Sequence, residues 1–117
     1  MKHALLLVAA ALSLSAPAFA QSDDAPKGDP VRGRKIFVTI GCFQCHGYAG
    51  VTGGPGGRLA PNPLPYDAVL GQLRTPRGRM PVYTAEVTPD QDVADIYAWL
   101  KSQPQPPAVA SIPLLAH

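Results

Sequence analysis

The sequence predicts a small all-α domain, and three observations lead to this expectation. The chain has 117 residues, which is enough for one domain. Apolar residues recur with helical spacing in segments 29–41, 66–74 and 88–102. The remainder is rich in Gly and Pro, with 11 and 14 residues. Because such loops build little core, a domain of this size needs a staple, a metal or a large apolar cofactor.

The first 20 residues have the pattern of a secretory signal peptide. A short basic start, 1–3, precedes an apolar run, 4–15, and the small-x-small sequence Ala18-Phe19-Ala20. The run is shorter than the roughly 20 residues that span a bilayer. We therefore expect export and cleavage after Ala20 rather than a membrane anchor, and no membrane span after processing. Residues 21–28 are polar and are predicted to form a flexible leader.

The first predicted helix begins at Asp29, an N-cap, followed by Pro30 at the first helical position. Its apolar face consists of Ile36, Phe37 and Ile40. Gly41 can end the helix. Gly33 lies inside it, where Gly costs about 1 kcal/mol relative to Ala. We therefore expect another helix to cross closely at Gly33.

A short second helix is predicted at 66–74, with apolar residues Val69, Leu70 and Leu73. The last predicted helix, at 88–102, has the clearest pattern. Thr88 is predicted as its N-cap, with Pro89 in the first turn and Gln91 as the capping-box residue. Its apolar stripe consists of Val93, Ile96, Tyr97 and Leu100, flanked by Trp99. This stripe leaves Asp92 and Asp95 towards water. The Pro-rich tail, 104–117, is expected to be extended or disordered.

The segment Cys42-Phe43-Gln44-Cys45-His46 is a C-x-x-C-H haem-attachment sequence. Two thiols three residues apart in one tight turn can each add to a haem vinyl group. The adjacent imidazole then lies under the iron as the proximal ligand. We therefore expect one covalent haem c, attached through Cys42 and Cys45 and ligated by His46. This large group also supplies the missing core.

Other uses of the two cysteines are a disulfide, a thioredoxin-like redox pair or half of a zinc site. A thioredoxin-like pair is disfavoured because no βαβ pattern surrounds the cysteines. A zinc site is disfavoured because no second Cys pair exists, and the only other His of the processed chain is His117.

Met80 is the predicted second axial ligand of the iron. It is the only methionine left after processing, and Pro81 follows it and stiffens the loop. Its separation from His46 lets the chain wrap to the opposite face of the haem. The alternative is that Met80 only fills a gap in the core.

The chain resembles the class I c-type cytochromes over residues 29–103. The matching features, in the family's order, are Gly33-x-x-x-Phe37, the C-x-x-C-H sequence, Met80-Pro81 and Asp95-Ile96-Tyr97-Ala98-Trp99-Leu100. The resemblance implies the small cytochrome c fold, with three to four short helices wrapped around one haem that has one exposed edge. It also implies that the first and last helices cross. The residues in contact are then Gly33 and Phe37 with Ile96 and Trp99.

One feature departs from the family. Relatives have a Gly-Pro-x-Leu segment whose Pro carbonyl orients the proximal imidazole. Here Gly57 stands two residues before Leu59, and the nearest prolines are Pro55 and Pro61. The carbonyl that serves His46 is therefore left open.

We expect one-electron transfer as a periplasmic carrier or electron-transfer subunit. An enzyme is not expected, because no catalytic dyad or triad accompanies the haem motif. One alternative is a haem enzyme or gas-binding sensor whose sixth ligand is labile or absent. Another is a tethered subunit of one dehydrogenase or oxidase, an interpretation that the Pro-rich tail favours.

The charged residues of the chain indicate which kinds of partner it can bind. Loss of Lys2 on processing lowers the net charge from +2 to +1, and two haem propionates would make it slightly negative, which does not suit a generally basic nucleic-acid binder. Arg74, Arg77 and Arg79 surround the expected ligand loop. They either frame the haem edge for an acidic redox donor or acceptor, or neutralise the haem propionates.

Overall fold

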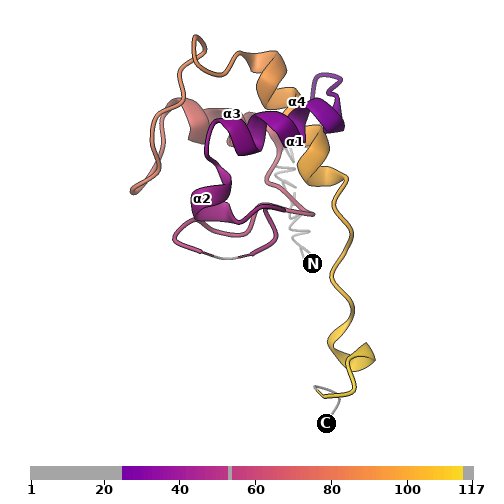
Figure 1. The fold of residues 1–117 in the computed structure, drawn as a ribbon. Coiled ribbons are helices and arrows are strands. Elements are labelled where there is room, and N and C mark those ends of the chain that lie inside the picture. The colour runs from indigo at the N-terminus through magenta and orange to yellow at the C-terminus, as the bar shows by residue number, and fades with distance from the viewer. Residues whose placement is uncertain (1–24, 53, 115–117) are drawn as a thin grey trace, which may run out of the picture.

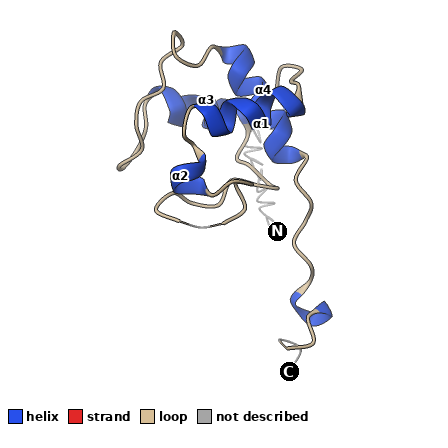
Figure 2. Ribbon diagram, in the orientation of Figure 1, coloured by secondary structure: helices blue, strands red, loops and turns tan. Residues whose placement is uncertain are grey.

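A computed structural model of the chain describes residues 25–52 and 54–114, and this part is helical (Figures 1 and 2). Its elements are α1 (Pro30–Thr39), α2 (Phe43–His46), α3 (Tyr66–Arg74), α4 (Asp90–Lys101) and the 3-10 turn η1 (Val109–Ser111). No strand occurs among the described residues. The all-α prediction is confirmed, and the short helix α2 carries the C-x-x-C-H sequence. The expected signal peptide, residues 21–24 of the expected leader and His117 lie outside the described residues.

Helix α1 begins as the sequence predicts. The Asp29 carboxylate accepts hydrogen bonds from the backbone N–H groups of Val31 (2.8 Å) and Arg32 (3.2 Å), which satisfies two of the free donors of the first turn. Pro30 occupies the first helical position. Gly41, at φ +86°, then turns the chain from α1 into α2.

The close crossing of α1 and α4 explains Gly33. A Cβ at this position would lie 1.9 Å from the backbone oxygen of Asp95, so only Gly permits the approach. One turn further along α1, the rings of Phe37 and Trp99 pack with centroids 4.8 Å apart. The predicted crossing is confirmed. Gly28, in the expected leader, approaches the backbone oxygen of Ala94 in the same way, with a built Cβ at 2.1 Å.

The prediction that Asp95 faces water is wrong. Its side chain is 1% exposed, because α1 crosses over this face of α4. It accepts hydrogen bonds from the backbone N–H of Asp29 (2.8 Å), the Arg32 guanidinium (2.6 Å) and the Gln91 amide (2.9 Å). Arg32 also pairs with Asp92, which is partly exposed. A buried carboxylate without such partners would be costly, and Arg32 supplies the compensating charge.

The start of α4 also differs from the prediction. The helix begins at Asp90, with Pro89 in the N-cap position and no side-chain cap. The Thr88 hydroxyl is buried without a hydrogen-bond partner among the described residues. Gln91 does not reach back in a capping box, because its amide donates to the Lys27 carbonyl (3.0 Å) and to Asp95.

Helix α4 contributes residues to two small apolar clusters. The first consists of Phe37, Ala60, Ile96, Trp99 and Leu100. The second consists of Tyr66, Leu73, Val93, Ala94 and Tyr97. Met80 and Tyr83 pack against the second cluster from the loop between α3 and α4. The core is therefore small and divided, as expected for a domain that needs a cofactor.

The chain after α4 runs away from the helices (Figure 1). Its described part, through Leu114, is mostly exposed and contains the single 3-10 turn η1. A hydrogen bond of 3.1 Å joins the Gln105 amide to the Asn62 side chain. No helix of the described chain has the length and apolar character needed to cross a membrane.

Replacing Gly33 by Ala tests the crossing. We expect Gly33→Ala to lower the free energy of unfolding by about 1–3 kcal/mol, because the methyl group collides with the α4 backbone. Gly71→Ala in α3 is the matched control, since nothing lies within 4 Å of a Cβ there. The control should be neutral or stabilise by about 0.5–1 kcal/mol. Thermal denaturation followed by circular dichroism measures both, and equal effects would contradict the crossing argument.

Candidate functional site

Four segments line a cavity of about 860 Å³, which lies within the roughly 300–1,000 Å³ of ligand pockets. The four residues that the sequence predicts as haem ligands or attachment points, Cys42, Cys45, His46 and Met80, all line it. They come from α2, from the turn before it and from the loop that follows α3. The structure therefore brings the predicted site residues together at one cavity.

Both cysteines and His46 lie on one turn. The Cys42 N–H donates to the Phe37 carbonyl (3.0 Å), and the His46 N–H donates to the Cys42 carbonyl (3.1 Å). The two thiols are not joined in a disulfide. Burial raises the pKa of the Cys42 thiol to about 11, against a smaller opposing effect of hydrogen bonds from the backbone and from Tyr83, so the free thiol is protonated at neutral pH. Cys45 is exposed.

The carbonyl of Gly57 orients His46. It lies 2.7 Å from Nδ1 of the imidazole. Because a carbonyl only accepts, Nδ1 carries the proton, and the lone pair of Nε2 is left for a metal. Gly57 stands at the position where relatives have Pro. The carbonyl that orients His46 therefore comes from the same position as in relatives, but from a Gly instead of a Pro.

The backbone around Gly57 is held against α2 by hydrogen bonds. Gly56 N–H donates to the Cys45 carbonyl (3.0 Å), and Gly54 N–H donates to the Gly56 carbonyl (3.1 Å). A Cβ on Gly56 would lie 2.5 Å from Cε1 of His46, whereas a Cβ on Gly57 would meet nothing within 4 Å. Gly56 is therefore required for close contact with the imidazole, and these bonds do the stiffening that proline would otherwise provide.

Met80 lies half-buried at the cavity between two exposed neighbours, Arg79 and Pro81. Its sulfur is 3.7 Å from the amide nitrogen of Gln72 on α3, which donates to it. Sequence reasoning missed Gln72, because only the path of the loop after α3 brings the sulfur to this side chain.

Tyr83 is a second residue that the sequence did not single out. Its backbone N–H donates to the Leu73 carbonyl (2.9 Å), and its hydroxyl donates to the Ile40 carbonyl (3.5 Å). The side chain lines the cavity next to Cys42. Burial is the main cause of its raised pKa, so the phenol remains neutral. Tyr83 thus connects the Met80 loop to the end of α1.

The three arginines of the predicted docking surface have different surroundings. Arg77 and Arg79 are exposed and line the cavity. Arg74 is not among the residues that line it. Its guanidinium donates to the carbonyls of Tyr83 (2.7 Å) and Thr88 (2.9 Å) and pairs with Asp90 (2.5 Å). Arg74 therefore ties the loop after α3 to the start of α4.

The residues present fit a haem. Two thiols share one turn, and the imidazole that follows them has its Nδ1 at the Gly57 carbonyl, which leaves Nε2 for a metal. A thioether sulfur and two cations line the same cavity. Among residues 25–52 and 54–114, no three His, Cys, Asp or Glu side chains gather to hold a bare metal ion.

A family model matches most of the described chain. The family model described as "Cytochrome C oxidase, cbb3-type, subunit III" matches residues 28–100. No curated protein and no solved structure matches the chain.

Adding a methyl group beside the imidazole tests the geometry of His46. Gly56→Ala should push the ring or the loop away and lengthen the bond to Gly57, because the methyl group cannot fit at 2.5 Å. A bond of this kind sets the basicity of the imidazole, so the reduction potential of the haem-bearing protein should shift. Gly57→Ala keeps the carbonyl and should leave the potential nearly unchanged. Equal shifts in the two variants, measured by redox titration, would contradict this role of Gly56.

Proposed function

The chain belongs to the family of cytochrome c oxidase, cbb3-type, subunit III, a c-type cytochrome domain, and from this premise we propose that it transfers single electrons through one covalent haem c. The observation that supports the proposal most directly is the meeting of Cys42, Cys45, His46 and Met80 at one cavity. The bound haem supplies the one-electron change of its iron. The chain itself holds the group, sets its ligands and limits access to it.

The proposed axial ligands are Nε2 of His46 and the sulfur of Met80. A neutral thioether favours ferrous iron and raises the reduction potential. The Gln72 amide, which donates to the sulfur, holds the thioether in one orientation and draws electron density from it. With both axial positions filled, electron transfer is favoured over gas binding or catalysis. We therefore propose that the protein is not an enzyme.

Export to the periplasm is proposed from the sequence of residues 1–20. Haem attachment in the resembling family follows export, so a cleavable leader and a C-x-x-C-H sequence agree with each other. Whether the processed protein is a free carrier or a subunit of one oxidase or dehydrogenase can be distinguished by co-purification from membranes.

Arg77 and Arg79 are the proposed contacts for a redox partner at the mouth of the cavity. Both are exposed, and the described residues offer no carboxylate in an ion pair with either. The alternative is that they neutralise the haem propionates. Arg74 is left out of this proposal because its guanidinium is engaged within the fold.

Met80→Ala tests the sixth ligand. The variant should keep its haem, because the bonds at Cys42 and Cys45 do not depend on Met80. It should bind carbon monoxide readily when reduced, lose the sulfur-to-iron charge-transfer band when oxidised and have a lower reduction potential. Absorption spectra and redox titration measure these changes. A wild-type spectrum and potential in Met80→Ala would rule out the assignment, and rapid carbon monoxide binding by the unmodified protein would favour the gas-binding alternative.

Processing is tested by mass. The mature protein, purified from the periplasmic fraction, should begin at Gln21 and carry the mass of one haem. Intact-mass spectrometry measures both. A membrane-bound chain that retains residues 1–20 would contradict the proposal.

Reversal of Arg77 and Arg79 to Glu tests docking at the cavity mouth. We expect slower electron exchange with an acidic partner and a weaker dependence of the rate on salt, because exposed charges steer association over about 10 Å at 0.1 M ionic strength. Arg58→Glu is the control, since Arg58 is exposed and does not line the cavity. Stopped-flow rates at several ionic strengths measure the effect. Rates and salt dependence equal to those of the unmodified protein would exclude docking through Arg77 and Arg79.

A further inference from the structure

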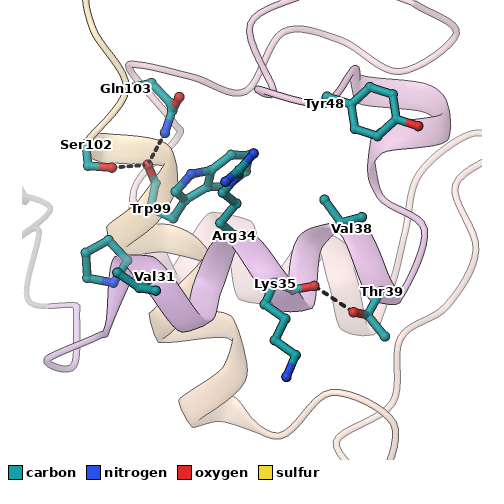
Figure 3. Close-up of a pocket in the computed structure, with 10 residues that line it drawn as sticks. Val31, Arg34, Lys35, Val38, Thr39, Tyr48, Trp99, Ser102 and Gln103 are labelled. Carbon is teal, nitrogen blue, oxygen red and sulfur yellow. Dashed lines mark hydrogen bonds between the residues drawn. The ribbon is translucent and has the colours of Figure 1, made fainter.

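A second hollow of about 700 Å³ lies along the outer side of α1 and shares no lining residue with the haem cavity (Figure 3). We call it the α1 groove. Its lining comes from α1, from Tyr48 and from the end of α4 at Trp99, Ser102 and Gln103. Neither the haem motif nor the crossing of α1 and α4 accounts for it.

The groove is lined by apolar side chains and by two cationic ones, Arg34 and Lys35. Val31, Arg34, Lys35 and Val38 form a stripe on α1 at helical spacing, on a different face from the one that Gly33 and Phe37 bury. Val31 is 80% exposed and Tyr48 is 69% exposed. Both side chains leave apolar surface open to a partner.

The charges at the groove are of one sign. Arg34 and Lys35 are the charged residues that line it, and no acidic residue does. Within the described part of the chain, neither side chain takes part in an ion pair. This differs from Arg32 on the same helix, which is paired with Asp92 and Asp95. The groove therefore presents two uncompensated positive charges beside an apolar surface.

The groove is also close to the haem-attachment turn. Tyr48 stacks on Phe43, with ring centroids 4.5 Å apart and an interplanar angle of 21°. Phe43 follows Cys42 directly in the chain. A molecule that touches Tyr48 is therefore one aromatic pair away from the residues that would carry the haem.

We propose that the α1 groove docks an acidic, apolar segment of a protein redox partner, separately from the mouth of the haem cavity. That the partner is a redox protein rests on the proposed function, whereas the docking itself rests on the groove. Acidic side chains of the segment pair with Arg34 and Lys35, and its apolar side chains cover Val31, Val38 and Tyr48. Such an arrangement allows one partner to bind here while the cavity mouth faces another.

Two other occupants match the groove less well. The chain's own Pro-rich tail contains no Asp or Glu at residues 104–117, so it has no carboxylate side chain that could pair with Arg34 or Lys35. In a second copy the carboxylates of α4 are engaged, since Asp90 pairs with Arg74 while Asp92 and Asp95 pair with Arg32. Outside α4 in the described chain, Asp29 caps α1, which leaves Asp67 and Glu86 as exposed carboxylates without an ion pair, and these lie on different segments.

The experiment is a titration of the haem-loaded, ¹⁵N-labelled protein followed by NMR. Trp99 is the only Trp of the chain and lines the groove, so its indole N–H gives one unambiguous signal. The probe is a synthetic peptide of alternating Glu and Leu, and the matched peptide alternates Gln and Leu. We expect the acidic peptide to shift the Trp99 and Tyr48 signals, the Gln peptide to bind more weakly, and added salt to weaken the acidic complex.

Charge reversal gives the second readout. Arg34→Glu with Lys35→Glu should weaken the acidic peptide about tenfold, which corresponds to roughly 1.4 kcal/mol. Arg58→Glu, a single charge reversal at an exposed residue outside the groove, is the control, and it should leave the affinity within about twofold. Should the double variant fail to fold, the salt dependence and the two peptides on the unmodified protein still decide the question.

Several results would overturn the inference. These are an unmoved Trp99 signal, equal binding of the two peptides, tighter binding of a peptide of residues 104–117, or a Trp99 shift on protein dilution alone. The last two would assign the groove to the tail or to a second copy. Failure of the proposed function would instead appear in the visible spectrum of the unmodified protein, and the peptide titration would still report on docking.

Discussion

The close approach of α1 to α4 at Gly33 is the contact on which the rest of this structure depends. It lets the α1 backbone lie almost against the backbone of Asp95, and it places Phe37 on Trp99. The end of α1 then sets the position of Gly41 and of the turn that carries Cys42 to His46. The loop with Met80 packs against the second apolar cluster, which α4 also supports. The walls of the proposed haem cavity are therefore held at their separation by one helix crossing rather than by a large core.

The same crossing creates an electrostatic requirement. Because α1 covers the face of α4 that holds Asp95, this carboxylate is removed from water and must be compensated. The Arg32 guanidinium, the Asp29 N–H and the Gln91 amide all donate hydrogen bonds to it. Asp29 in turn caps α1 through its own side chain. The start of α1 and the middle of α4 are thus linked by polar groups on one side of Gly33 and by aromatic packing on the other.

The proposed haem site shows how a family feature can persist when its usual residue is absent. Relatives present a proline carbonyl to the proximal imidazole, and here Gly57 presents the carbonyl. Glycine alone would leave the loop free, but the Gly56–Cys45 and Gly54–Gly56 hydrogen bonds hold it. On the other side of the cavity, Gln72 meets the sulfur of Met80. Both ligands that we propose for the iron therefore have a hydrogen-bond partner, as is usual for groups that ligate metals.

The sequence by itself was sufficient for the features that depend on neighbouring residues. Helical spacing predicted α1, α3 and α4, the cap at Asp29 predicted the start of α1, and the C-x-x-C-H sequence predicted that both cysteines and His46 share one tight turn. Gly33 indicated a crossing, and the resemblance named its partners. Tertiary structure decided the rest. It buries Asp95, leaves Thr88 and Gln91 outside a capping box, brings the Gly57 carbonyl to His46, engages Arg74 within the fold and creates the α1 groove. These features arise between residues far apart in the chain, such as Arg32 and Asp95, and local periodicity carries no information about which distant side chain a buried charge or imidazole will meet.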